Sequence, residues 1–137
     1  MGKTFSSAEE LCDILGAVFR RSLQETELGK KLIGLNKSLR FFFRDPQAEI
    51  TVQVDGAHWE VVCGPCDAPA DIKFWMTGDA AHRLWSGKVK PLAAIMAREI
   101  RAAGPVRALA EIEAVFSLSS DIYKQVLREK GRQDLLR

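Results

Sequence analysis

Long apolar runs, abundant cysteine and a charge of one sign are all missing from this sequence of 137 residues. No stretch approaches the roughly 18 consecutive apolar residues that a membrane-spanning helix needs. Twenty Lys and Arg residues face eighteen Asp and Glu residues, and the formal net charge of +2 is too small to indicate binding to nucleic acid. The hydrophobic share of 47% and the charged share of 28% exclude a disordered tail and are typical of a single globular domain over residues 1–137.

The small number of cysteines bears on the compartment. Three cysteines are too few for a disulfide scaffold, and their odd number favours a reducing cytoplasm over secretion. The N-terminal segment has no apolar run of the kind found in signal peptides. We therefore predict a soluble protein located in the cytoplasm.

The spacing of apolar residues changes twice along the chain. Helical spacing predicts an amphipathic helix over residues 7–24, opened by a Ser-Ser-x-Glu-Glu capping pattern, and a shorter helix that ends near residue 35. Strict alternation follows, and the turn signals Asp45-Pro46 and Asp55-Gly56 separate its segments. This pattern predicts an antiparallel meander of four strands, over residues 39–44, 50–55, 58–63 and 72–77.

Helical spacing returns in the second half of the chain. It predicts short helices over residues 79–85 and 91–96, a fifth strand near 99–102 and a helix that opens at Pro105. Ser119-Ser120-Asp121 has the residue types of a break and a new cap, so we predict a separate last helix within residues 119–137. This order predicts an α+β fold with helices covering one face of a five-stranded, mainly antiparallel sheet.

The string Cys63-Gly64-Pro65-Cys66 is identical to the thioredoxin active-site motif. That chemistry needs its first thiol at a helix N-terminus, whereas residues 67–71 are rich in Pro and Asp and lead into a strand. A dithiol redox module is therefore the weaker interpretation, and a turn that brings two cysteines close is the stronger one. A regulatory or adventitious disulfide between Cys63 and Cys66 is the remaining alternative.

No other pattern points to catalysis or to a cofactor. His58 and His82 are the only histidines; with Cys63 and Cys66 they lack a second paired zinc-ligand motif, so we predict no metal site. The sequence has no nucleophile elbow and no glycine-rich phosphate loop. We therefore predict a protein without catalytic residues or cofactors. What remains is an excess of large apolar side chains on short helices, which either fill a core or cover an apolar cavity.

The ordered set of these segments resembles the sterol carrier protein 2 (SCP-2) family. The resemblance rests on the strand Ala70–Asp79, the segment Leu84–Pro91 with its Gly-Lys and Pro, and the hairpin Phe41–Gly56, and it covers about residues 8–118. It implies a hydrophobic tunnel between the helices and the sheet. The sequence departs from the family pattern at Trp75 and Trp85, which are bulkier than usual and would narrow that tunnel.

The resemblance also implies a function. Family members bind and transfer fatty acids, acyl-CoA, sterols or phospholipids without catalysis, so we predict a lipid ligand here. The alternative is an accessory protein that presents an isoprenoid lipid of the ubiquinone type to biosynthetic enzymes. Positions that match the family pattern, with their neighbours, predict a lipid-binding site at Met76, Leu84, Trp85, Ile95, Met96, Leu109 and Phe116.

Two basic regions have open roles. Lys88 and Lys90 lie either at a tunnel mouth, where they would meet a carboxylate or phosphate, or on a solvated turn. The last helix lies beyond the resemblance and carries several Lys and Arg residues. It could pack over the tunnel, mediate a dimer or make transient contact with a membrane surface.

Overall fold

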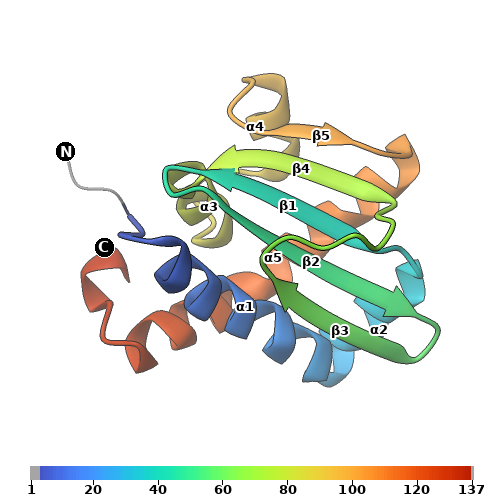
Figure 1. Ribbon diagram of the computed structural model, residues 1–137, viewed down its shortest axis with the longest axis horizontal. Coiled ribbons are helices and arrows are strands. Elements are labelled where there is room, and N and C mark those ends of the chain that lie inside the picture. The colour runs from blue at the N-terminus through green and yellow to red at the C-terminus, as the bar shows by residue number, and fades with distance from the viewer. Residues whose placement is uncertain (1–3, 137) are drawn as a thin grey trace.

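A computed structural model describes residues 4–136 and places helices over one face of a five-stranded sheet (Figure 1). The strands are β1 (Leu39–Arg44), β2 (Ala48–Asp55), β3 (His58–Cys63), β4 (Ile72–Thr77) and β5 (Arg101–Ala103). The helices are α1 (Ala8–Gln24), α2 (Thr26–Leu35), α3 (Gly78–Trp85), α4 (Pro91–Met96), α5 (Val106–Glu129) and the short 3-10 helix η1 (Gln133–Leu136). The predicted α+β class, with a sheet of mostly antiparallel strands, is confirmed.

Local signals fix several helix starts. Ser7 caps α1, because its hydroxyl accepts the Glu10 backbone N–H at 3.1 Å, and the Glu10 carboxylate accepts the Ser6 N–H at 2.9 Å. Thr77 caps α3 by accepting the Ala80 N–H at 3.0 Å. Pro91 is the first residue of α4, where its missing N–H costs no hydrogen bond.

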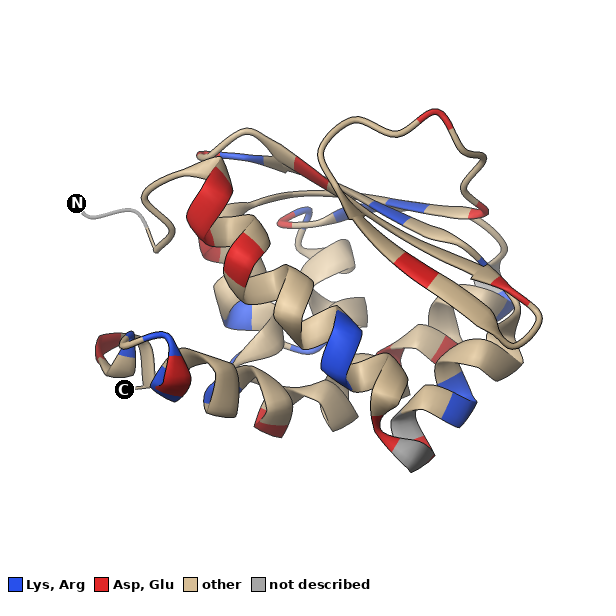
Figure 2. Cartoon of the chain, turned by 60° about the horizontal axis from the view of Figure 1, so that its bottom comes forward, with Lys and Arg blue, Asp and Glu red and all other residues tan. Residues whose placement is uncertain are grey.

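The strand order differs from the predicted meander. The order is β3-β2-β1-β4-β5, and β4 pairs with β1 in parallel, with Phe74 opposite Phe41. The chain therefore crosses the sheet after β3, through residues 64–71. The Arg40 guanidinium donates a hydrogen bond to the Ala68 carbonyl of this crossing segment. Figure 2 shows the segment arching above the sheet, on the face opposite the helices. A meander is wrong here because a Pro-rich connection this long is not a hairpin turn.

The two faces of the sheet have different partners. The inner face packs against the helices and carries the buried side chains Leu39, Phe41, Phe43, Ile50, Val52, Ile72, Phe74 and Met76. The outer face carries the alternate residues, among them Phe42 and Trp75, whose rings stack at 5.4 Å. The period of two therefore separates the core from the solvent side, as the sequence predicts.

The predicted break near residue 119 does not occur, because α5 runs without interruption from Val106 to Glu129. The Ser119 hydroxyl donates to the Phe116 carbonyl at 2.9 Å, and the Ser117 hydroxyl donates to the Glu113 carbonyl at 3.2 Å. Serines that bond to the preceding turn are tolerated inside a helix. The prediction of a separate last helix was therefore wrong: residues 119–129 continue α5.

The end of α5 is fixed to α1 by ion pairs. Arg21 pairs with Glu129, Lys130 Nζ lies 3.0 Å from Asp13, and Arg132 lies 2.7 Å from Glu10. Arg132 also donates to the Thr4 carbonyl at 3.0 Å. The C-terminal segment thus packs along α1.

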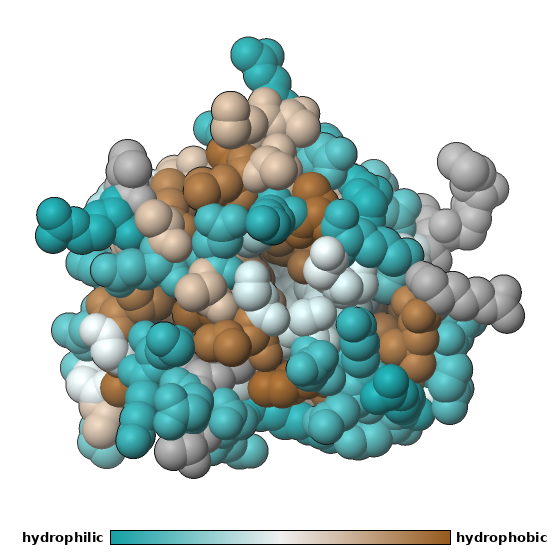
Figure 3. All heavy atoms as spheres, turned by 180° about the vertical axis from the view of Figure 1, so that it is seen from behind, coloured by the Kyte–Doolittle hydropathy of each residue, from teal (hydrophilic) through white to brown (hydrophobic). Residues whose placement is uncertain are grey.

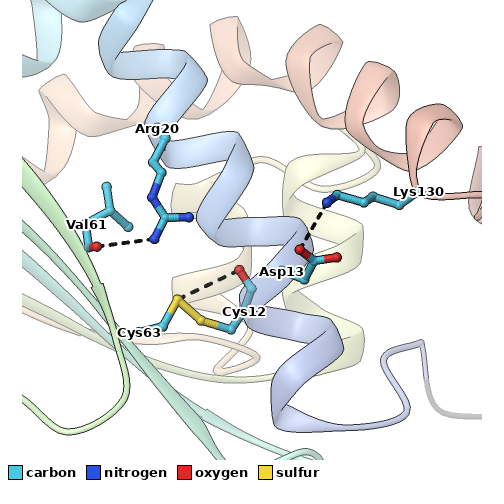
Figure 4. Close-up of a disulfide and its surroundings, with 6 residues drawn as sticks. All are labelled: Cys12, Asp13, Arg20, Val61, Cys63 and Lys130. Carbon is cyan, nitrogen blue, oxygen red and sulfur yellow. Dashed lines mark hydrogen bonds and ion pairs between the residues drawn. A yellow bond between two sulfur atoms is a disulfide. The ribbon is translucent and has the colours of Figure 1, made fainter.

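A disulfide joins α1 to β3. It links Cys12 to Cys63, whose Cα atoms are 6.1 Å apart (Figure 4). Beside it, the Arg20 guanidinium donates to the Val61 carbonyl at 3.4 Å. Cys66 is left as a free thiol, so the expected closeness of Cys63 and Cys66 does not lead to a bond between them. No helix starts at Cys66, as the sequence predicts.

Candidate ligand-binding site

Four of the predicted site residues meet in one buried layer between the sheet and the helices. Met76 comes from β4, Leu84 and Trp85 from α3, and Phe116 from α5. Trp85 is 1% exposed, and its ring meets that of Phe116 edge-on at 4.9 Å. The turn capped by Thr77 leads β4 directly into α3, and this places Met76 and Leu84 on the same side of the sheet.

Aromatic rings of residues outside the predicted site complete this layer. Phe19 of α1 lies 5.6 Å from the Trp85 ring, and Phe41 of β1 lies 5.7 Å from it. Phe74 stacks on Phe41 at 4.8 Å. The alternation of β1 and β4 already placed Phe41 and Phe74 on the apolar face. Their packing against Trp85 depends on the parallel pairing of those strands, which the sequence did not predict.

The other predicted site residues lie at the edge of the layer or outside it. Ile95 and Leu109 are half-buried and pack against the core. Met96 is 84% exposed, so its predicted place in the wall is wrong for this structure. Helical geometry explains this, because Pro91 and Ala94 form the buried side of α4 and a residue at position 96 points away from them.

Trp75 does not narrow the layer. It lies on the outer face of the sheet, stacked on Phe42, with the Arg101 guanidinium 4.9 Å from the centre of its ring. Of the two bulky departures from the family pattern, only Trp85 occupies the space between helices and sheet.

Two pockets lie at the rim of the layer. One, of about 510 Å³, lies between the start of α1, the β1–β2 turn and the segment after β3. The other, of about 390 Å³, lies where β1 and β4 end, beside the segment that links α4 to β5, and its lining includes the outer-face residues Phe42, Trp75 and Arg101. Phe43 lines both pockets and Met76 lines the second, although each residue is only 4% exposed. Both pockets therefore reach the edge of the buried layer, whose interior is filled by packed rings.

The SCP-2 sterol transfer family matches residues 15–117. The chain belongs to this family. Lipid binding and transfer is the general role of SCP-2 domains, and it applies to this SCP-2 domain at that level. No curated protein sequence matches the chain significantly.

Solved structures share the fold of this SCP-2 domain. Apo sterol carrier protein 2 from Yarrowia lipolytica is 19% identical, with a TM-score of 0.61 over 79% of this chain and 91% of that one. A possible sterol carrier protein from Thermus thermophilus, TT1886, is 20% identical, with a TM-score of 0.61 over 91% and 95%. The ubiquinone synthesis protein UbiJ-SCP2 is 15% identical, with a TM-score of 0.60 over 78% and 88%.

Polar groups inside this SCP-2 domain are paired with one another. His82 Nδ1 lies 2.7 Å from the Tyr123 hydroxyl, at the interface of α3 and α5. Burial lowers the pKa of His82 and raises the pKa of Tyr123. Among the side chains that the structure describes, no buried nitrogen or oxygen lacks a hydrogen-bond partner, and no three His, Cys, Asp or Glu residues are grouped to hold a metal ion. Within residues 4–136, no helix is long and apolar enough to cross a bilayer.

Proposed function

We propose that this SCP-2 domain is a noncatalytic carrier that holds the apolar part of a lipid between the sheet and α1, α3 and α5. The wall would include Met76, Leu84, Trp85 and Phe116, with Ile95 and Leu109 at its edge. One observation carries the proposal: Phe43 and Met76 belong both to the buried layer and to the rim pockets. A small movement of these two side chains would connect a pocket to the layer.

The chemistry of the layer suits such a ligand. Each methylene moved from water into apolar surroundings contributes about 0.8 kcal/mol, so an acyl chain binds with few polar contacts. Methionine is unbranched and adapts easily to a new neighbour, which suits Met76 to the position where a chain would enter. The ligand would push the edges of the aromatic rings apart, and it would not fill a permanent tunnel.

The rim favours a lipid with an anionic head. Arg44, Arg98 and Arg101 line the 390 Å³ pocket. Glu99 is the one carboxylate in its lining, and it is already paired with Arg83 at 3.1 Å. We therefore propose a fatty acid or acyl-CoA in preference to a sterol, with the negative group at these arginines and the chain directed past Met76.

The first test is native mass spectrometry of gently purified protein, followed by extraction of whatever is bound. A discrete adduct that resolves to an acyl lipid supports the proposal. A clean apo mass that takes up neither added fatty acid nor a polyprenyl probe refutes it.

The second test locates the ligand. The chain has three tryptophans, so Trp59→Phe combined with Trp75→Phe leaves Trp85 as the reporter inside the layer. The matched control, Trp59→Phe with Trp85→Phe, leaves Trp75 as the reporter on the outer face. A long-chain fatty acid brominated near the methyl end of its chain should quench Trp85 more strongly than Trp75, because Trp75 lines the pocket proposed for the head. Equal quenching of both would place the lipid outside the layer.

The third test concerns the head. Arg101→Gln should weaken fatty-acid binding about tenfold or more, because a charge-assisted hydrogen bond contributes about 1.5–3 kcal/mol. The same variant should bind the corresponding neutral fatty alcohol as well as the unmodified protein does. Arg128→Gln, at an exposed position on α5, is the matched control. Equal losses for acid and alcohol would refute an anionic head at this rim.

The alternative function is an accessory protein that presents an isoprenoid lipid to biosynthetic enzymes. The likeness of the fold to UbiJ-SCP2 is compatible with it. Extraction of a polyprenyl lipid, together with pull-down of biosynthetic enzymes, would favour this alternative over free lipid exchange.

A further inference from the structure

The outward side of α4 has no polar side chain. Leu92 is 43% exposed and Met96, one turn later, is 84% exposed, while Ala93 and Ala97 add apolar surface beside them. Residues 91–97 include no residue that carries a charge or a polar side chain. Three large apolar side chains are exposed among those whose burial the structure describes, and two of them lie together here.

Cations outnumber acidic residues around this helix, and the nearest carboxylate in sequence, Glu99, is paired with Arg83. Residues 80–98 contain no Asp or Glu, but they carry Arg83, Lys88, Lys90 and Arg98. These four residues carry four positive charges, whereas the formal net charge of the whole chain is +2. All the other residues together therefore carry a net negative charge. Lys88, Lys90 and Arg98 are exposed, and none of them enters an ion pair within residues 4–136.

The place of α4 in the fold makes this surface accessible. Figure 1 shows α4 at the top rim of the molecule, beside the edge strand β5. Figure 3 shows brown and tan atoms gathered at this rim, with teal atoms around them. Arg98 and Glu99, which follow α4, also line the 390 Å³ pocket, so the rim lies next to that pocket.

We propose that α4 and its flanking cations form the surface by which this protein docks reversibly on an anionic bilayer. Leu92 and Met96 enter the interface between headgroups and acyl chains, while Lys88, Lys90 and Arg98 contact the anionic headgroups. Shallow apolar insertion and electrostatic attraction are both weak alone, and together they produce reversible membrane binding.

The observations favour a bilayer over a protein partner. A stable protein interface buries about 800 Å² on each side and includes well-packed aromatic anchors. The tip of a six-residue helix with one Leu and one Met offers neither. The C-terminal segment is a poorer candidate for membrane contact, because Lys130 and Arg132 are already paired with carboxylates of α1.

The test is flotation of the full chain with vesicles. One set is made of phosphatidylcholine alone, and the other of equal parts of phosphatidylcholine and phosphatidylglycerol. The unmodified protein should bind the anionic set and lose that binding as salt is raised. Met96→Asp should weaken binding about tenfold, because it removes apolar burial and adds a like charge. Lys88→Gln with Lys90→Gln should weaken binding by roughly tenfold or more.

Matched controls change the same residue types elsewhere. Leu118→Asp alters the third exposed apolar side chain, which is 48% exposed on α5, and Lys30→Gln with Lys31→Gln alters two exposed lysines of α2. Both controls should bind vesicles as the unmodified protein does. Equal losses in the controls, or equal binding to both vesicle sets, would overturn the proposal.

Two further readouts separate the remaining outcomes. Light scattering of the protein in solution tests whether a second copy covers α4. A dimer that Met96→Asp converts to a monomer, together with no vesicle binding, overturns the proposal. Uptake of fatty acid in solution is measured separately and should be unchanged by Met96→Asp. Vesicle docking therefore stands or falls independently of the lipid-carrier proposal.

Discussion

Replacing Trp85 with alanine should lower the free energy of unfolding by about 3–5 kcal/mol, the usual cost of truncating a buried tryptophan. Trp85 is fully enclosed, and its ring contacts Phe19, Phe41 and Phe116 at centroid distances of 4.9–5.7 Å. The same change removes the largest side chain from the layer proposed to hold lipid. The variant should therefore become less stable and more receptive to an apolar ligand.

Urea unfolding followed by far-ultraviolet circular dichroism measures the stability of this variant. A domain of this size unfolds with about 5–15 kcal/mol, so the loss is a large fraction of the total. It should lower Tm by roughly 6–20 °C. A fatty acid added at a hundred times its Kd should restore about 2.7 kcal/mol of the lost free energy of unfolding. Trp85→Phe is a milder change, and its unfolding can be measured in the same way if the alanine variant does not fold.

Trp59→Ala is the matched control, because Trp59 is half-buried on β3 and lines neither of the two rim pockets. It should cost less than Trp85→Ala and leave the stabilisation by fatty acid unchanged. A loss below about 1 kcal/mol for Trp85→Ala would contradict the tight packing of the layer. A fatty acid that stabilises the unmodified protein more than the variant would contradict the position proposed for the ligand.

Three other predictions concern pH, redox state and the C-terminal segment. Burial lowers the pKa of His82 below 6.5 in the folded protein. As the pH falls below 6.5, the unfolded chain therefore binds a proton at His82 before the folded protein does, and the free energy of unfolding decreases. His82→Gln should flatten the fall of Tm over this pH range. Reduction, or Cys12→Ser, opens a loop of 51 residues and should cost up to about 4 kcal/mol in urea unfolding, whereas Cys66→Ser should cost nothing. Arg132→Met should lower Tm in low salt more than in high salt.

Local signals in the sequence predicted the helices well. The Ser-Ser-x-Glu-Glu pattern that opens α1 and the first helical residue Pro91 depend on neighbours within a few residues, so they can be identified without a fold. Ser119 shows the limit of such signals, because a serine can either cap a helix or bond to its preceding turn. Here Ser119 is buried and bonds to the preceding turn.

The features that the sequence missed depend on distant partners. The parallel pairing of β4 with β1 is set by the crossing of residues 64–71, which no periodicity records. The pairing of Cys63 with Cys12 rather than with Cys66 follows from the inner face of β3 lying against α1. For the site, it was the resemblance to the family pattern, not periodicity, that indicated Met76, Leu84, Trp85 and Phe116. The outward position of Met96 depends on which side of α4 meets the core.

The continuity of α5 has a consequence for how this chain can be divided. The family match ends at residue 117, in the middle of a helix that runs to Glu129. Tyr123, Val126 and Leu127 lie beyond that point, and all three are fully buried. A chain shortened to the matched region would expose the surfaces they cover on α1 and α3. The region that the family match covers is therefore shorter than the unit that folds in this protein.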